Sequence, residues 1–384
     1  MGKFSFQQYQ QWLVCVSLPD SHKLREVCHF AETGIDTADR SPQCTIRIKT
    51  LVEAQVAQAL HLRSVFRSLA LALRYLLAKS TRSIDEVLLT MSQTDGSILS
   101  PSDVNNLVGI KPTVGLTSRY LVIPISQHQD TIGPMARTVK DAAYLLQAVA
   151  GPGGHYDNDN YTQANPNKDH LPDYVAACNF SALRGARFGV ARNVIELFSD
   201  NSSDPVLQAF NAAIKTIKAA GATIVDANFT ALTEWAVSNN ESIVLETDFI
   251  NDLAHYLSEL TYNPNNIHSL AQLANFTEKF PGEHYPERDI GVWQSALQLG
   301  YNASDYRAYK ARQADLYLGG PGGILGALQR QKLNAVLLPT QFASPFPAIV
   351  GSPVVTVPMG FYPANETVVM NRFGNLVAVG PNIP

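Results

Sequence analysis

Glycine and asparagine are nearly absent from the first quarter of this chain of 384 residues. Before Gly96 the only glycines are Gly2 and Gly34, and no asparagine precedes Asn105, whereas both residue types are abundant later. The composition therefore changes near residue 92. We expect residues 1–92 to be an atypical N-terminal segment, mistranslated or disordered, and residues 93–384 to form the folded domain, truncated at both ends.

Other absences exclude whole classes of function. No apolar run reaches the roughly 18 residues that a membrane-spanning helix needs, so we expect a soluble chain. The formal net charge of −4 gives no basic field for nucleic acid. The cysteines show no C-x-x-C spacing, which leaves neither a metal site nor a disulfide framework: Cys15, Cys28, Cys44 and Cys178. We therefore expect free thiols.

Sequons for N-glycosylation favour a secretory or extracellular location without deciding the compartment. Each begins an N-x-[ST] triplet, which is glycosylated only in a secreted protein: Asn160, Asn179, Asn201, Asn228, Asn240, Asn275, Asn302 and Asn365. The apolar stretch Trp12–Leu18 follows several glutamines, so it is not a clear signal peptide.

Hydrophobic periodicity predicts an α/β fold. It indicates a helix over Met135–Ala150, a strand over Arg187–Ala191, a helix from the Asp204-Pro205 cap to Gly221, and a second strand over Ala222–Val225. A strand, a helix and a strand in this order imply parallel pairing.

The second half of the chain extends the same pattern. Ala335–Leu338 and Pro353–Val357 are predicted strands of the same sheet, so we expect a large, mostly parallel mixed β-sheet flanked by helices. We expect loops over Asn239–Asn266 and Phe276–Tyr306. The glycines of Gly319–Gly323 are not followed by G-K-[ST], and we interpret them as a turn rather than a phosphate loop.

One short turn carries the chemistry. Ser97 follows Thr94, Asp95 and Gly96, so its hydroxyl stands where successive backbone N–H groups can point at one spot and form an oxyanion hole. A D-G-S turn without a catalytic role is commoner, so this turn by itself is a weak indicator.

The context of the turn is far more specific. From Thr94 the chain contains TDGSILSPSD, GIKPTVG, SR, PIS, DTIGP and ARTVKDA, in that order. This region resembles the signature of the amidase signature family, and the later AVLLPT and GSPVVTVPMGFYP resemble the strands that follow it. The chain is most similar in character to fungal amidases that resemble glutamyl-tRNA amidotransferase A subunits.

The resemblance implies an amide hydrolase that uses a serine nucleophile and no cofactor. It assigns the nucleophile to Ser97 and the oxyanion N–H groups to Thr94, Asp95 and Gly96, and the partner would be a small-molecule amide. It gives Lys111 a structural role in anchoring a loop. It also implies that Asp130 and Arg137 tie the signature loops together.

The family's activating groups are missing from the expected places. In the family a lysine and a relay serine in a Gly/Ser-rich loop precede the nucleophile, but no glycine lies between Gly34 and Gly96. Read from each codon's third base, Lys49–Ala59 is compatible with Asp-Pro-Cys-Gly-Ser-Ser-Ser-Gly-Ser-Ser, the missing loop. Our hypothesis is therefore a frame-shifted or mis-spliced segment and a chain with little turnover.

Two alternatives stay open on the sequence. One is a Ser-His-Asp esterase that uses Ser97 with His128 and Asp130, although the G-x-S-x-G elbow is lacking. The other is a non-enzymatic binding protein, or a remnant, on the amidase fold.

Overall fold

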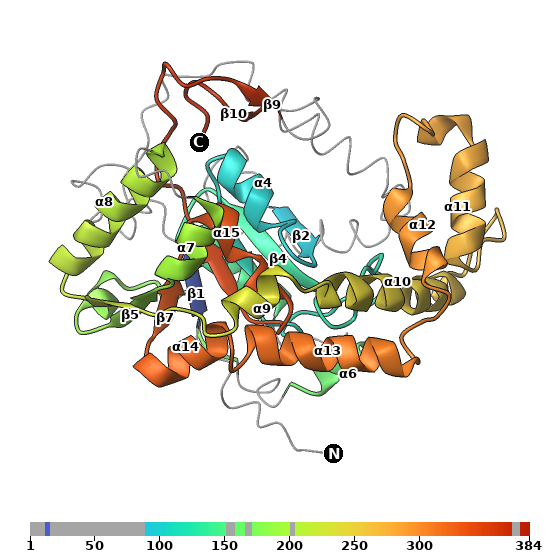
Figure 1. Ribbon diagram of the computed structural model, residues 1–384, viewed down its shortest axis with the longest axis horizontal. Helices are drawn as coiled ribbons and strands as arrows, with labels where there is room; N and C mark the ends of the chain where they lie inside the picture. Colours follow the sequence, from blue (N-terminus) through green and yellow to red (C-terminus); the bar gives the residue numbers. More distant parts are fainter. Residues whose placement is uncertain (1–11, 16–88, 151–157, 166–170, 200–203, 371–376) are drawn as a thin grey trace. The chain divides into compact units, whose positions relative to one another are not determined.

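An eight-stranded mixed sheet carries the fold, in the strand order β2-β4-β3-β8-β1-β7-β5-β6 (Figure 1). The computed structural model describes residues 12–15, 89–150, 158–165, 171–199, 204–370 and 377–384, all of which belong to one compact unit. The strands of this sheet are β1 (Trp12–Cys15), β2 (Leu89–Gln93), β3 (Val108–Lys111), β4 (Thr131–Ala136), β5 (Arg187–Val190), β6 (Thr223–Asp226), β7 (Ala335–Leu337) and β8 (Val354–Thr356).

The sheet has a parallel part and an antiparallel part. Strands β8, β1, β7, β5 and β6 run parallel to their neighbours in that series. Strands β2, β4 and β3 pair antiparallel, and β3 joins β8 in the same way. The predicted mixed, mostly parallel sheet is therefore confirmed, as is the placement of β7 and β8 in it.

The predicted strand–helix–strand unit is also present. Strands β5 and β6 are parallel neighbours, and α8 (Pro205–Ala219) lies between them in the chain. The Asp204 carboxylate accepts a hydrogen bond from the N–H of Val206 at 2.8 Å, and Pro205 needs no such partner. The helix buries one apolar stripe, as predicted: Leu207, Phe210, Ile214 and Ile217.

The remaining helices are α4 (Leu99–Val104), α5 (Val139–Val149), α6 (Asn160–Gln163), α7 (Arg192–Phe198), α9 (Leu232–Ala236), α10 (Asn240–Glu259), α11 (Leu270–Lys279), α12 (Gly291–Gln298), α13 (Tyr306–Gly319), α14 (Ile324–Gln331), α15 (Thr340–Ala343) and α16 (Pro345–Ala348). Short 3₁₀ helices cover η3 (Phe180–Leu183) and η4 (Pro281–Glu283), and β9 (Val369–Met370) pairs with β10 (Val377–Val379) in a separate small sheet. As predicted, Gly319–Gly323 leads through a turn into α14.

Two predictions about helices were wrong. The helix expected from Met135 begins at Val139, because the Thr138 side chain caps it and Met135 belongs to β4. The loops expected over Asn239–Asn266 and Phe276–Tyr306 contain α10, part of α11, and α12. These helices pack against one another through a small apolar cluster that includes Leu253 and Leu270.

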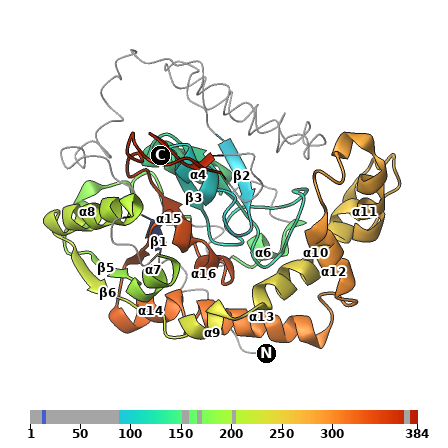
Figure 2. The same cartoon turned by 45° about the horizontal axis from the view of Figure 1, so that its top comes forward.

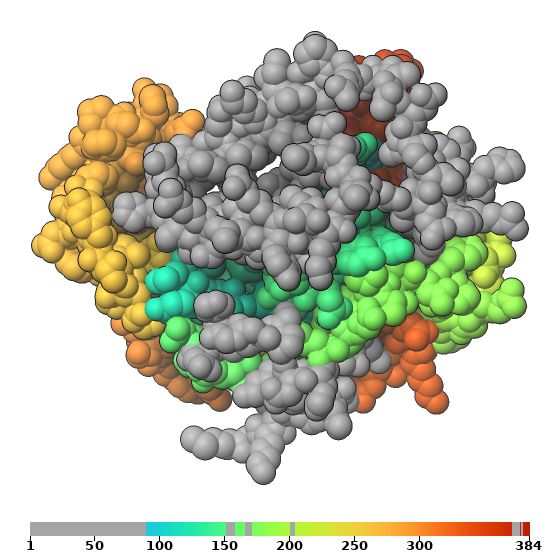
Figure 3. All heavy atoms as spheres, turned by 180° about the vertical axis from the view of Figure 1, so that it is seen from behind, coloured from blue at the N-terminus to red at the C-terminus, as the bar shows by residue number. Residues whose placement is uncertain are grey.

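Helices α10, α11 and α12 gather on the side away from α8 and β6 in both ribbon views (Figures 1 and 2). In the space-filling view from behind, the teal part of the chain, which follows β2, is partly visible between these gold helices and the green part, which follows residue 150 (Figure 3). No helix among the described residues has the length and apolarity needed to cross a bilayer.

Part of the early segment belongs to the sheet. Strand β1 (Trp12–Cys15) lies between β7 and β8 and pairs parallel with both. The rest of the segment over residues 1–92, up to residue 88, lies outside the described residues, as does the Lys49–Ala59 region of the frame-shift hypothesis.

Candidate active site

The Thr94–Ser97 turn joins β2 to α4 at the antiparallel edge of the sheet. The buried side chain of Gln93 organises it: its Oε1 accepts the N–H groups of Ile98 at 2.7 Å and Leu99 at 3.0 Å, and its Nε2 donates to the Asp95 carbonyl. One amide side chain thus caps α4 and holds the turn closed. Sequence reasoning missed Gln93, because nothing in its neighbourhood distinguishes it from any residue at the end of a strand.

Thr94 is fixed by a buried carboxylate. Its hydroxyl donates to Asp130 Oδ1 at 2.5 Å, while Oδ2 accepts the N–H groups of Ile125 at 2.8 Å and Ser126 at 3.0 Å. Burial raises the pKa of Asp130, and these hydrogen bonds oppose that rise. Asp130 therefore ties two signature segments together, as the resemblance implied. Arg137 does not do so among the described residues, where its exposed side chain makes no hydrogen bond or ion pair.

Backbone donors are available in the turn. Within the described part of the chain, the N–H groups of Asp95, Gly96 and Ser97 donate no hydrogen bond. Gly96 does not have a positive φ. Its lack of a side chain matters because a Cβ there would approach Ser100 Oγ to 3.0 Å and Ser344 Oγ to 3.6 Å. The side chain of Ser97 is exposed. The turn can therefore present a hydroxyl beside N–H groups that the described residues leave without a partner.

Asp95 points away from solvent. One of its oxygens, Oδ1, is buried without a hydrogen-bond partner among the described residues. Burial raises the pKa of the Asp95 carboxyl, and a hydrogen bond from Ser344 and the charge of Lys111 act in the opposite direction. Asp95 thus gives the turn its backbone N–H, while its side chain belongs to the interior.

Lys111 is fully buried at the end of β3. Its Nζ donates to the Ser352 carbonyl at 2.8 Å and to the Pro112 carbonyl at 3.4 Å. Burial lowers the pKa of Lys111 to about 7, against the opposing charges of Asp95 and Asp130. These contacts support the predicted role of Lys111 as an anchor, here for the segment that leads into β8.

The residues of the alternative triad are not brought together. His128 Nδ1 lies 2.6 Å from Asp248 Oδ2, whereas Asp130 contacts Thr94 and the backbone of Ile125 and Ser126. Without Asp130 on its imidazole, His128 does not form the triad expected for a Ser-His-Asp esterase.

No metal cluster marks Ser97 in the described part of the chain. No group of three or more histidine, cysteine, aspartate or glutamate side chains there is arranged to hold a metal ion. A cavity beside α4 is lined by Asp103, Thr340, Met359 and Tyr362 among others, but Ser97 is not one of its lining residues. Burial raises the pKa of Asp103 to about 6.

Comparisons with known proteins agree on one family. The family model described as Amidase matches residues 90–375. A protein of Arthroderma benhamiae named "Putative amidase" is 48% identical over 294 residues, which cover 76% of this chain and 48% of that protein. The A subunit of the glutamyl-tRNA(Gln) amidotransferase of Salinispora arenicola is 43% identical over 139 residues, covering 35% of this chain and 26% of that protein.

Solved structures give the same result. The native peptide amidase of Stenotrophomonas maltophilia matches with a TM-score of 0.60 and 30% identity, over 72% of this chain and 56% of that one. An amidase family protein from Bacillus anthracis matches with a TM-score of 0.59 and 25% identity, over 71% of this chain and 50% of that one. The chain therefore spans about half the length of the relatives that it matches over most of its own length.

Proposed function

This chain belongs to the amidase family, and from that premise we propose that it hydrolyses amide C–N bonds with Ser97 as the nucleophile. The observation that carries the proposal is the Thr94–Ser97 turn, where an exposed hydroxyl stands beside backbone N–H groups without hydrogen-bond partners in the described part of the chain. The substrate class is a small-molecule amide.

The reaction follows from this geometry. The Ser97 oxygen attacks the amide carbonyl carbon, and the resulting oxyanion accepts hydrogen bonds from N–H groups of the turn over Thr94–Ser97. The C–N bond then breaks, the proton of the Ser97 hydroxyl passes to the leaving amine, and Ser97 carries the acyl group as an ester. Water attacks this ester, releases the carboxylic acid and restores the hydroxyl. No metal or organic cofactor takes part in any step.

This chain is proposed to turn over slowly. The upstream sequence lacks the Gly/Ser-rich loop in which the family holds its relay serine, since no glycine lies between Gly34 and Gly96, and the Nζ of Lys111 donates to two carbonyls at the end of β3. Without a base, the Ser97 hydroxyl keeps its high pKa and remains a weak nucleophile. A non-enzymatic protein on the same fold is the competing proposal, and it predicts no covalent adduct at all.

Covalent labelling tests the nucleophile. A fluorophosphonate probe is expected to form one adduct, slowly, at Ser97, and Ser97→Ala should abolish it. Ser100→Ala is the matched control, because Ser100 is also exposed and lies only one turn farther along the chain. Peptide mass spectrometry locates the adduct. Equal labelling of the Ser97→Ala chain, or no labelling of the unchanged chain at long exposure, would contradict the assignment.

We also propose that the chain is a glycoprotein of the secretory route. Its sequon asparagines are exposed at residues 160, 179, 228, 275, 302 and 365, whereas Asn240 is half-buried and donates to Ser238 Oγ at 2.6 Å; Asn201 lies outside the described residues. Expression through a secretory host should therefore give a protein whose mass falls on treatment with an N-glycosidase. Asn302→Gln should remove one glycan, and Asn240→Gln should change little. An unmodified secreted product would argue against the proposal.

A further inference from the structure

Three carboxylates on one face of α10 hold the loop Ile125–Asp130. Glu241, Asp248 and Asp252 are seven and four residues apart, so they project from the same side of the helix. Glu241 Oε1 accepts Gln129 Nε2 at 2.9 Å, and Asp252 Oδ2 accepts the N–H of Gln127 at 2.7 Å.

Asp248 makes the central contacts. Its Oδ2 accepts the Ser126 hydroxyl at 2.5 Å and lies 2.6 Å from His128 Nδ1. The carboxylate side chain is only 2% exposed, so these two loop residues supply partners that water cannot. A buried carboxylate that loses its hydrogen-bond partners destabilises the fold, so Ser126 and His128 are held beside Asp248.

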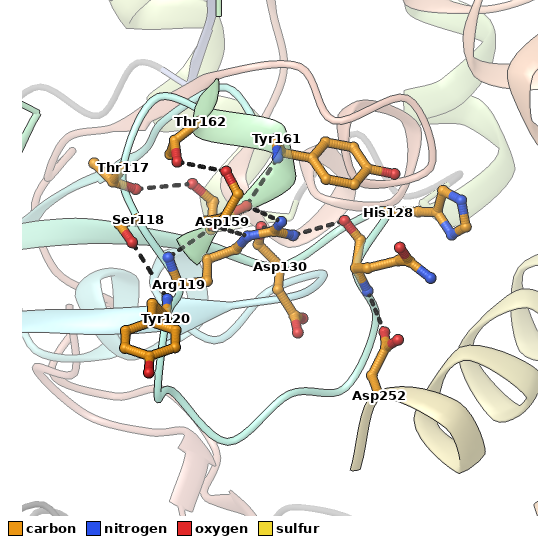
Figure 4. A network of polar contacts seen from close by, with 12 residues as sticks. Thr117, Ser118, Arg119, Tyr120, His128, Asp130, Asp159, Tyr161, Thr162 and Asp252 are labelled. Atoms are coloured by element: carbon orange, nitrogen blue, oxygen red, sulfur yellow. Dashed lines mark hydrogen bonds and ion pairs between the residues drawn. The ribbon is translucent and has the colours of Figure 1, made fainter. Parts of the chain in front are cut away.

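The other side of the loop is held just as firmly. Arg119 Nη1 donates to the Gln127 carbonyl at 2.6 Å, and the same guanidinium forms a two-pronged ion pair with Asp159 at 2.7 and 2.8 Å. Asp252 on α10 and Arg119, both labelled in Figure 4, therefore hold the N–H and the carbonyl of Gln127 respectively. The loop is therefore clamped between α10 and the segment that starts α6.

The last residue of this loop reaches the turn. Asp130 accepts the Thr94 hydroxyl with one oxygen and the backbone of Ile125 and Ser126 with the other. Any shift of Ser126 must therefore move the carboxylate that fixes Thr94. A continuous path of hydrogen bonds runs from Asp248 through Ser126 and Asp130 to Thr94.

We propose that Asp248 is a positioning residue for the Thr94–Ser97 turn, acting through Ser126, His128 and Asp130 without contacting the turn itself. The catalytic importance of the turn rests on the proposed function. The structural coupling between Asp248 and the turn does not. It assigns to α10 a role that neither its sequence pattern nor its family membership indicates: the helix sets the geometry of the oxyanion donors.

Hydrogen–deuterium exchange of the turn tests the coupling. In Asp248→Asn, the amide groups of Ile98 and Leu99, which bond to Gln93, should exchange on the order of ten-fold faster. Thr247→Val is the matched control, since Thr247 is buried on the same helix and, among the described residues, its hydroxyl bonds only to carbonyls of α10 itself. In that control the turn should exchange as in the unchanged chain.

A double substitution separates positioning from general loosening. If the path runs through Asp130, adding Asp248→Asn to Asp130→Asn should produce no further increase in exchange at the turn. Additive increases, or equal exchange in Asp248→Asn and Thr247→Val, would overturn the proposal. Should Asp248→Asn fail to fold, Ser126→Ala cuts the same path and is expected to give the same increase at Ile98 and Leu99.

Labelling keeps the two proposals distinguishable. Coupled exchange in a chain whose Ser97 takes no fluorophosphonate would refute the proposed function and leave the positioning role intact. Labelling at Ser97 that is equally fast in Asp248→Asn and Thr247→Val, with unchanged exchange, would refute the positioning role and leave the proposed function intact.

Discussion

Raising the pH from about 5 to about 7 is expected to destabilise this chain by roughly 2–4 kcal/mol. Burial raises the pKa of Glu241, Asp252 and Asp315 to about 7 in each case, far above the ordinary range of a carboxyl. Like charges add to the rise for two of them, Asp95 acting on Glu241 and Asp248 acting on Asp252. All three groups therefore favour the neutral form in the folded chain.

The direction of the effect follows from linkage. A carboxyl whose folded pKa is raised binds its proton more tightly in the folded chain than in the unfolded chain. The stability that this contributes is complete below the unfolded pKa near 4, and it is lost as the pH rises to about 7. Asp315 shows the physical reason: its Oδ2 is buried without a partner among the described residues, so an ionised Asp315 would be a buried charge that the charge of Arg312 offsets only in part.

Urea unfolding at several pH values between 5 and 7 measures this slope. Asp315→Asn, which is close in shape and cannot ionise, should flatten the curve by about a third to a half. Glu234→Gln is the control, because Glu234 is exposed on α9. A stability that rises over this pH range would show that the three carboxyl groups are ionised in the folded chain, and an unchanged slope in Asp315→Asn would show this for Asp315.

The parallel part of the fold was predictable because its signals are local. The unit of β5, α8 and β6 is marked by Asp204-Pro205 at one end of the helix and Gly221 at the other, and both act within a few residues. Strand β1 could not be predicted in the same way. Its partners are Ala335–Leu337 and Val354–Thr356, and a pairing between segments so far apart in the sequence leaves no signal in the neighbouring residues.

One of the helices that were missed, α10, shows a physical cause. α10 turns carboxylates toward a polar loop instead of a continuous apolar stripe toward the sheet. Periodicity in apolar residues is the main signal for a helix, and a helix that binds through polar contacts weakens it. Strand β4 was overlooked for another reason, since Gly133 and Pro134 are residue types that usually interrupt strands.

The residues of the candidate site also differ in how well the sequence predicts them. Ser97 and the turn residues came from motif resemblance, and their catalytic roles remain predictions. The groups that hold the turn, Gln93 and Asp248, had no motif, because each acts through a contact that exists only after folding. Asp130 was predicted because it lies inside the signature itself.

Between pH 7 and pH 9.5 the stability of the chain is expected to rise by about 2–3 kcal/mol, through Lys111. Burial lowers the pKa of Lys111 from its ordinary 10.5 to about 7. For an amine whose folded pKa is lowered, the unfolded chain holds the proton more tightly, so stability is lost as the pH falls from about 10.5 to about 7. Raising the pH across this window therefore recovers it.

Lys111→Met should remove this rise, because methionine has a similar length and no charge to lose. Lys215→Met on the exposed face of α8 should keep it. Urea unfolding of the three chains at pH 7, 8.5 and 9.5 measures the change in each free energy of unfolding. Tyrosine ionisation contributes equally to all three chains, so it drops out when the chains are compared. Parallel curves for the unchanged chain and Lys111→Met would mean that Asp95 and Asp130 keep Lys111 charged throughout. Lys111 would then be one half of a buried ion cluster behind the Thr94–Ser97 turn, and the turn, rather than the Ser352 carbonyl, would be what its charge stabilises.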